Sequence, residues 1–184
     1  MIERITNLDD VLDLFEGFET SMYRLEALQV YDVAYERDRY EAFLAGEPVD
    51  LAPSSWQNLV RRHRAEGRDV DRVHVVFEPL TEYLRYEMST AYQRNAAAGE
   101  RIAIIATAEG SWPAHVPTVD YWLFDDRDLW IMIYDAQGQF VAAERRTEPT
   151  EVQRSVSGKY AALRAAVPLA DYLAAQPPLL RRVS

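Results

Sequence analysis

Apolar residues along the first third of the chain repeat mostly at helical spacing. Between residues 8 and 18 they recur at intervals of three and four, and Asn7 is placed to cap the start of this helix. From Met22 to Val33 apolar and charged residues alternate, which is typical of a strand, with a helix as the alternative. The pattern predicts three helices in all here, at 8–18, at 35–45 and from Ser54 or Ser55 to Gly67.

The middle of the chain has the pattern of a βαβ unit. Val73–Phe77 is a compact β-branched run, and Arg101–Ala108 is a second apolar strand. Residues 80–98 between them form the longest helical pattern, and Gly99 follows as a C-cap. A strand, a helix and a strand in this order predict two parallel strands joined by a right-handed crossover.

The last third of the chain predicts an antiparallel meander and a final helix. Three strands are expected at Val119–Asp125, Leu129–Asp135 and Gln139–Arg145, joined by an acidic turn and a Gln-Gly turn. The helix at 150–166 ends before Pro168.

These elements predict an α+β fold, with a mixed sheet in which a βαβ unit is followed by an antiparallel meander, and helices at the N-terminus and C-terminus. A length of 184 residues fits one domain, and 48% hydrophobic residues are enough for a core. We therefore expect a single domain over 1–184, divided into a mainly helical part at 8–67, a sheet-containing core at 70–173 and a polar tail at 174–184.

The composition limits the location and the partners. The sequence has no cysteine, which favours a reducing compartment, and it has no signal-peptide pattern or apolar run of about 18 residues. We expect a cytoplasmic protein without a membrane contact. A net charge of −10 also disfavours direct binding of nucleic acid, so the basic run Arg61–Arg64 is interpreted as a solvated helix face.

The densest group of carboxylates lies in the predicted meander. Alternation along the strand places Asp120 on one face with Trp122 and Phe124, and a carboxylate on an apolar face must be solvated, paired or functional. The run Asp125–Asp128 is better explained by the needs of a hairpin turn than by a metal site.

The long predicted helix carries an unusual amount of polar and aromatic chemistry. Arg85 and Tyr92 are seven residues apart, hence on one side, where they would clamp a carboxylate, a phosphate or a base. Glu82 and Ser89 are equally available to Arg85 as local partners, so a solvated face with intrahelical pairs is the favoured interpretation. The three histidines are too scattered for a zinc site, and no nucleophile elbow, Walker loop or dinucleotide fingerprint occurs.

Several short motifs stand out along the chain. They are Leu14-Phe15, Tyr23-Arg24-Leu25-Glu26, Phe43-Leu44-Ala45-Gly46-Glu47-Pro48, Tyr83-Leu84-Arg85-Tyr86-Glu87, Asn95 with Ala98-Gly99-Glu100, and Asp120-Tyr121-Trp122-Leu123-Phe124-Asp125-Asp126. Together they resemble an uncharacterised actinobacterial domain-of-unknown-function family, often encoded beside helix-turn-helix regulators and small acidic proteins. The resemblance covers most of residues 14–172 and is most specific in its last two motifs.

The resemblance implies a regulatory or toxin-antitoxin-like setting, and it implies no established activity. The family usually has phenylalanine where this chain has Tyr121. A remote similarity to the phospholipase-D-like fold also exists, but the chain lacks the His-x-Lys motif on which that family's hydrolysis depends.

The leading hypothesis is a non-enzymatic regulatory or ligand-binding protein that acts with a helix-turn-helix regulator, a small acidic protein or a small molecule, without a cofactor. Its ligand-binding residues are predicted to be Arg85, Tyr92, Asn95, Asp120 and Trp122. One alternative is an enzyme that uses magnesium or manganese on nucleotide or phosphoester substrates, with the metal held by Glu87, Asp120, Asp125 and Asp126. Another alternative is a protein-interaction module.

Overall fold

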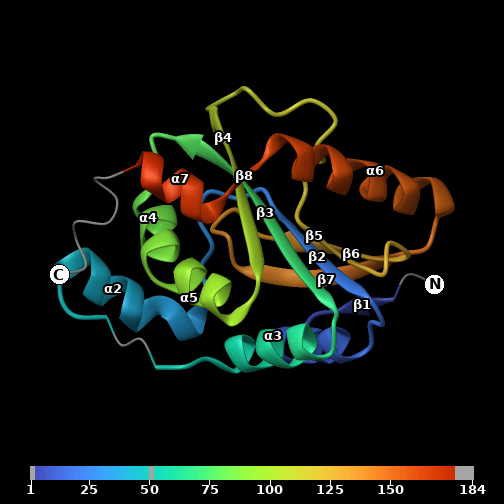
Figure 1. Ribbon diagram of the computed structural model, residues 1–184, viewed down its shortest axis with the longest axis horizontal. Helices are drawn as coiled ribbons and strands as arrows, with labels where there is room; N and C mark the ends of the chain where they lie inside the picture. The colour runs from blue at the N-terminus through green and yellow to red at the C-terminus, as the bar shows by residue number, and fades with distance from the viewer. Residues whose placement is uncertain (1–2, 50–51, 177–184) are drawn as a thin grey trace.

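The computed structural model describes residues 3–49 and 52–176, which fold around one eight-stranded sheet (Figure 1). The three adjacent strands β2, β3 and β4 are parallel, and the other pairings are antiparallel. The predicted α+β class with a mixed sheet is confirmed. From one edge to the other, the strands are β1 (Arg4–Ile5), β7 (Phe140–Arg146), β6 (Asp128–Tyr134), β5 (Tyr121–Phe124), β2 (Ser21–Glu26), β3 (Asp69–Glu78), β4 (Arg101–Ala108) and β8 (Val167–Pro168).

The predicted βαβ unit is present, but its helix is broken. Strands β3 and β4 are parallel neighbours, and the crossover consists of α4 (Glu82–Ser89) and α5 (Ala91–Ala98). At the break, Thr90 has φ −122° and ψ −83°, and its hydroxyl donates a hydrogen bond of 2.6 Å to the Tyr86 carbonyl. The prediction of one continuous helix was wrong because a threonine hydroxyl that bonds to the preceding turn bends a helix.

The N-terminal segment supplies a central strand as well as helices. Strand β2 is confirmed, although it ends at Glu26 and not at Val33, and it lies between β3 and β5. Asn7 caps the first helical segment as predicted. The helical elements of this segment are α1 (Leu8–Val11), the 3₁₀ helix η1 (Leu12–Glu16), the 3₁₀ helix η2 (Ala34–Glu36), α2 (Arg37–Ala45) and α3 (Ser55–Ala65).

The meander β5-β6-β7 and its acidic turn are confirmed. Asp125 and Asp126 both have φ 53°, a left-handed conformation that aspartate tolerates in tight hairpin turns. The Asp125 carboxylate also accepts hydrogen bonds from the backbone amides of Glu19, Thr20 and Ser21. Although burial opposes ionisation, these bonds lower the pKa of Asp125 to about 2, so the turn is tied to the start of β2.

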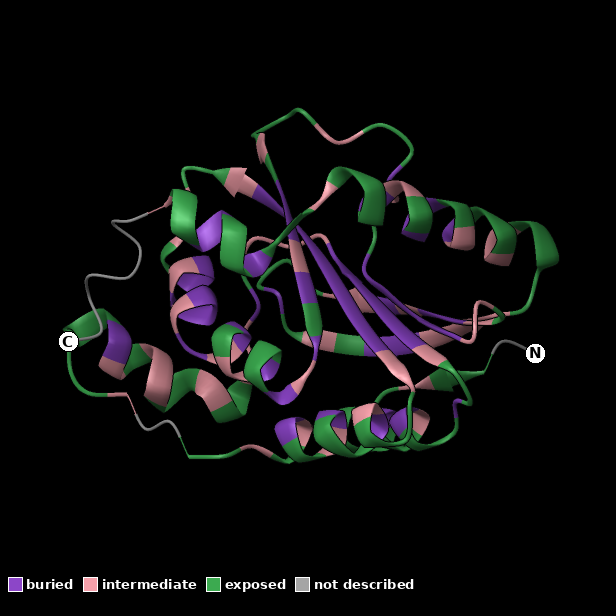
Figure 2. Ribbon diagram, in the orientation of Figure 1, coloured by how far each residue is buried: buried purple, intermediate pink, exposed green. Residues whose placement is uncertain are grey.

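The sheet lies between two helical layers (Figures 1 and 2). Helix α6 (Pro149–Ala165) covers one face, where Tyr23, Leu25 and Leu123 are fully buried. Helices α3, α4 and α5 cover the other face, and α2 packs on α4. None of the helices in the described ranges has both the length and the apolar composition needed to span a bilayer.

The C-terminal segment continues beyond the helix predicted to be last. After α6 the chain adds β8 to the edge of the sheet and forms α7 (Leu169–Ala175), which packs on β4. Helix α7 was not predicted, because Pro168 was interpreted as a terminator, whereas it is the residue that caps the new helix. The tail predicted at 174–184 therefore begins inside α7, and its part from 177 onward lies outside the described residues.

Close packing of α6 leads to a first prediction. A Cβ added at Gly158 would lie 2.4 Å from Cδ of Pro117, whereas a Cβ at Gly17 would meet nothing within 4 Å. Gly158→Ala should lower the free energy of unfolding, because overpacking costs about 1–3 kcal/mol and the gain in helix propensity is only about 1 kcal/mol. Urea denaturation should show this loss for Gly158→Ala and none for the control Gly17→Ala. Equal stability of Gly158→Ala and the wild type would contradict the packing of α6.

Candidate functional site

The sheet face beneath α4 and α5 carries buried charged residues. Arg24 and Glu26 of β2 and Arg72 of β3 are only 3%, 6% and 9% exposed. They share one face because side chains two residues apart point the same way, and Arg24 is paired in register with Arg72 and with Trp122. Charges at this depth are stable only when they are paired or hydrogen-bonded.

One half of this buried network joins Arg24 to Asp120. The Arg24 Nη2 donates to Asp120 Oδ2 at 2.7 Å and to the Tyr134 hydroxyl oxygen at 2.9 Å. Asp120 also accepts from the Tyr31 hydroxyl at 2.6 Å and from the Ala27 amide at 2.8 Å. Burial raises the pKa of Asp120, and Arg24 and Tyr31 oppose that rise.

The other half of the network is centred on Arg72. Its Nη1 donates to Glu26 Oε1 and its Nε to Glu100 Oε1, both at 2.6 Å. The Tyr92 hydroxyl donates to Glu26 Oε2 at 2.6 Å and lies 2.7 Å from Nδ1 of His74. Although burial opposes ionisation, Arg72 and then Arg24 hold the pKa of Glu26 well below its usual range. Glu26 is therefore an anion shared by the two halves.

Two atoms of this network lack a partner. Neither Arg24 Nη1 nor Glu87 Oε2 has a hydrogen-bond partner in the part of the chain that the structure describes, and both atoms are buried. Glu87 lies on α4 and is 8% exposed. Burial, and then the charges of Glu26 and Glu36, raise the pKa of Glu87 well above its ordinary value. Both effects favour the protonated form of Glu87.

The helix η2 lies between this network and the surface. The Tyr83 hydroxyl of α4 donates to Glu36 Oε2 at 3.2 Å. Tyr35 is 68% exposed, yet crowding by protein atoms and the charge of Glu36 raise its pKa to about 12. The charge of Arg72 lowers this pKa and the charge of Glu87 raises it. Tyr35 and Glu36 thus form the outer edge of the buried network.

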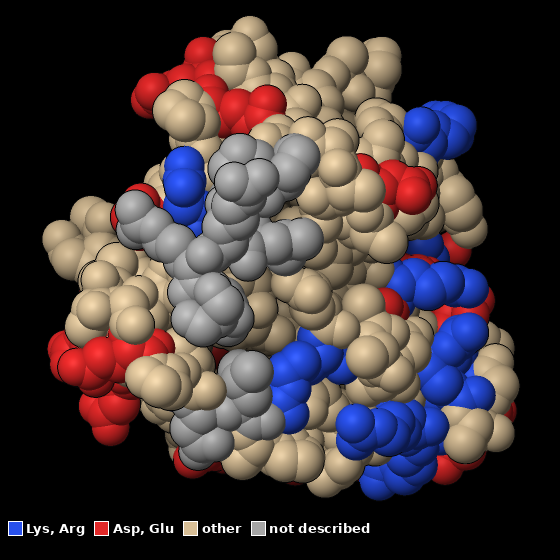
Figure 3. Space-filling view, turned by 60° about the vertical axis from the view of Figure 1, so that its left-hand side comes forward, with Lys and Arg blue, Asp and Glu red and all other residues tan. Residues whose placement is uncertain are grey.

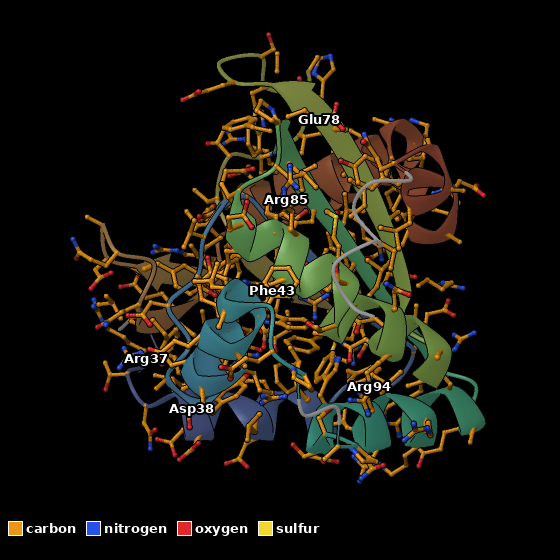
Figure 4. The ribbon with its side chains drawn as sticks, turned by 90° about the vertical axis from the view of Figure 1, so that its left-hand side faces the viewer. Arg37, Asp38, Phe43, Glu78, Arg85 and Arg94 are labelled. Carbon is orange, nitrogen blue, oxygen red and sulfur yellow. The ribbon has the colours of Figure 1, made fainter. Side chains whose placement is uncertain are left out.

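Three of the five predicted ligand-binding residues lie in this network. Tyr92 and Asp120 take part in its hydrogen bonds, and the Arg24 Cζ lies 5.3 Å from the ring centre of Trp122. Asn95 lies beside the network, where its Oδ1 accepts from Gln57 Nε2 at 3.3 Å. Arg85 is separate. Its Nε lies 4.0 Å from Glu82 Oε1 in a local pair, and Figure 4 shows it on the helical layer above Phe43.

The four carboxylates suggested for a metal lie in different places. Glu87 and Asp120 belong to the buried network, whereas Asp125 binds the backbone before β2. Asp126 accepts from Lys159 Nζ at 2.7 Å and from the Tyr160 hydroxyl at 2.9 Å. Within residues 3–49 and 52–176, no group of three or more histidine, aspartate or glutamate side chains is arranged to hold a metal ion.

Arginines gather at one end of the face shown in Figure 3. Arg62 pairs with Glu16 at 2.6 Å, and Arg64 pairs with Asp69 at 2.7 Å. Arg61 and Arg62 are exposed, whereas His63 is buried at 1%. The basic run on α3 is therefore largely neutralised by acidic neighbours within this surface.

The charged core of the network was not predicted from the sequence. Arg24 and Glu26 were used only as the polar partners in an alternating strand pattern, and Arg72 precedes the strand boundary that the apolar run suggested. A usable signal exists, because Arg24 stands between Tyr23 and Leu25, and His74 stands between Val73 and Val75. Charges on strands that pair in the middle of a sheet indicate a buried polar site.

The family model described as "Domain of unknown function (DUF6879)" matches residues 9–174. The chain belongs to this family. The match confirms the resemblance to an uncharacterised family and includes every residue of the buried network. A comparison with curated proteins finds no similar sequence.

The pairing of Arg24 with Asp120 leads to a stability prediction. Asp120→Ala would leave Arg24 buried without its closest anion, and loss of one partner of a buried ion pair costs about 3–5 kcal/mol. Asp13→Ala removes a carboxylate from an exposed position of η1 and should change the free energy of unfolding by less than about 0.5 kcal/mol. Chemical denaturation measures both. A similarly small loss for Asp120→Ala would show that the pair is solvated.

The protonation of Glu87 predicts how stability depends on pH. Above the ordinary glutamate pKa, the unfolded chain has released this proton while the folded protein still holds it, so Glu87 makes stability fall as pH rises. Glu87→Gln removes this loss. The variant should therefore gain stability relative to the wild type as pH rises from about 5 to about 8, by at most about 1.4 kcal/mol per pH unit.

Denaturation at several pH values tests this, with Glu82→Gln on the exposed side of the same helix as the matched control. The stability difference between Glu82→Gln and the wild type should not grow as pH rises. A stability difference for Glu87→Gln that stays constant with pH would mean that Glu87 is already ionised in the folded protein.

Proposed function

We propose that this protein is a non-enzymatic, ligand-binding regulator whose site is the buried network between the central strands and α4. The observation that supports this most strongly is that Arg24 Nη1 and Glu87 Oε2, both buried, have no partner among the described residues. A small polar molecule that accepts a hydrogen bond from Arg24 and bonds to Glu87 would complete the network.

The energetics favour a binding role over a purely structural one. A buried ion pair is seldom more stabilising than apolar side chains of the same volume, so a structural role alone gives little reason for charges at the centre of a sheet. Each unsatisfied buried group also costs about 1–3 kcal/mol. A bound ligand removes that cost, and strands hold the ligating groups more rigidly than loops do.

The position of Glu87 suggests how binding would be signalled. Glu87 lies on α4, and α2 packs on the same helix through Phe43, whose ring centre is 5.6 Å from that of Tyr86. A ligand that contacts Glu87 and Glu36 would therefore contact both α4 and η2. The helix η2 directly precedes α2. We propose that the outer surface of these helices reports occupancy to a partner protein in the cytoplasm, with a helix-turn-helix regulator as the expected partner.

Native mass spectrometry of the protein purified from its own host tests this proposal. We expect a small molecule that is retained under native conditions and lost on denaturation. Glu87→Gln should retain much less of it, whereas the matched variant Glu82→Gln, exposed on the same helix, should retain as much as the wild type. A native mass equal to that of the bare chain would contradict a binding site. Equal retention by the two variants would place the ligand elsewhere.

A further inference from the structure

The network holds more carboxylates than cations. Around Arg24 and Arg72, five carboxylates act within one hydrogen-bonded or electrostatically coupled group. These carboxylates are Glu26, Glu36, Glu87, Glu100 and Asp120. Both arginines already face carboxylates, Arg24 at 2.7 Å and Arg72 at 2.6 Å. Arg39 also acts on Glu36, so the five carboxylates face three arginines. The imbalance falls on Glu36 of η2 and on Glu87, because neither accepts a hydrogen bond from an arginine within the described residues.

The unbalanced carboxylates lie beside an aromatic cluster. Tyr83 is the centre of this cluster, with ring centres of Tyr31, Tyr40 and Tyr86 at 6.1, 5.6 and 6.1 Å, and its hydroxyl donates to Glu36. Aromatic faces and carboxylates together attract organic cations, since the ring quadrupole and the full negative charge act in the same direction. An anionic ligand would meet a region that already has excess negative charge.

We propose that the ligand carries a cationic nitrogen, an ammonium or guanidinium group, which binds Glu87 and Glu36 against the tyrosine cluster while a neutral oxygen of the ligand accepts from Arg24 Nη1. This inference rests on the proposed function and specifies its ligand class. It stands on the geometry of two buried atoms without partners in the described chain and on the surplus of carboxylates around them.

Binding of a cation here must be coupled to loss of a proton. The titratable and charged groups that interact with Glu87 are Arg24 and Glu26 of β2, Arg72 of β3, Tyr35 and Glu36 of η2, Tyr83 and Tyr86 of α4, and Tyr92 of α5. In the free protein the raised pKa favours the protonated form of Glu87, which offsets part of the surplus negative charge. A ligand cation takes over that role, so the carboxyl proton leaves to solvent as the ion pair forms. Affinity should then rise with pH by up to about tenfold per unit while free Glu87 is protonated.

Isothermal titration calorimetry tests the ligand class with ethanolamine, N-acetylputrescine and 4-guanidinobutanamide as cationic probes that also carry a neutral oxygen, and with inorganic phosphate and succinate as anionic ones. All titrations are made at matched ionic strength, because a chain with a net charge of −10 attracts any cation weakly. We expect saturable binding of at least one cationic probe, tighter at about pH 8 than at about pH 6. Glu87→Gln should weaken it tenfold or more, and the matched variant Glu82→Gln should leave it unchanged.

The outcomes separate this inference from the proposed function. Saturable binding of phosphate or succinate that is lost in Glu87→Gln would overturn the cationic ligand class while supporting a binding site. If a cation binds with equal affinity to Glu87→Gln and Glu82→Gln, or with an affinity that does not change with pH, it binds to the general acidic surface and the inference is overturned. Binding of none of the three cations would also overturn it, and the proposed function would still be judged by the mass of the protein from its host.

Discussion

The pairing of two arginines with carboxylates on the inner face of the sheet is the interaction on which the rest of the site depends. Arg24 and Arg72 stand opposite each other on parallel neighbouring strands, so each lies in the field of the other as well as in a desolvated environment. Such an arrangement is stable only if anions surround both groups. Asp120, Glu26 and Glu100 supply these anions. Tyr31 also donates to Asp120, Tyr92 to Glu26 and Trp56 to Glu100.

The topology explains how these partners meet. Strand β2 is inserted between β3 of the βαβ unit and β5 of the meander, so groups that are 96 residues apart, Arg24 and Asp120, become neighbours. Helices α4 and α5 then close the face and bring Glu87 and Tyr92 onto it. The helical crossover is broken at Thr90, which lies between these two residues.

Local sequence patterns were sufficient to predict most helices and strands, but they were insufficient to predict the buried network. The apolar periodicities of β4, α6 and the meander depend on neighbours in sequence, and these were predicted to within a few residues. The carboxylate Asp120 was recognised because it shares its strand face with the aromatic residues Trp122 and Phe124. The sequence pattern did not identify Arg24, Glu26 and Arg72 as site residues. Whether a polar strand face is buried depends on which helices cover it, and that is a property of tertiary packing. Arg85 was favoured for its chemistry, yet its helix turns it toward Glu82.

A crystal structure of the protein purified from its own host would test the central claim most directly. The account predicts electron density of a small organic molecule within hydrogen-bond distance of both Arg24 Nη1 and Glu87 Oε2. Density for ordered water alone at these two atoms, or a direct bond between the two side chains, would make the network a structural feature and contradict a binding site there.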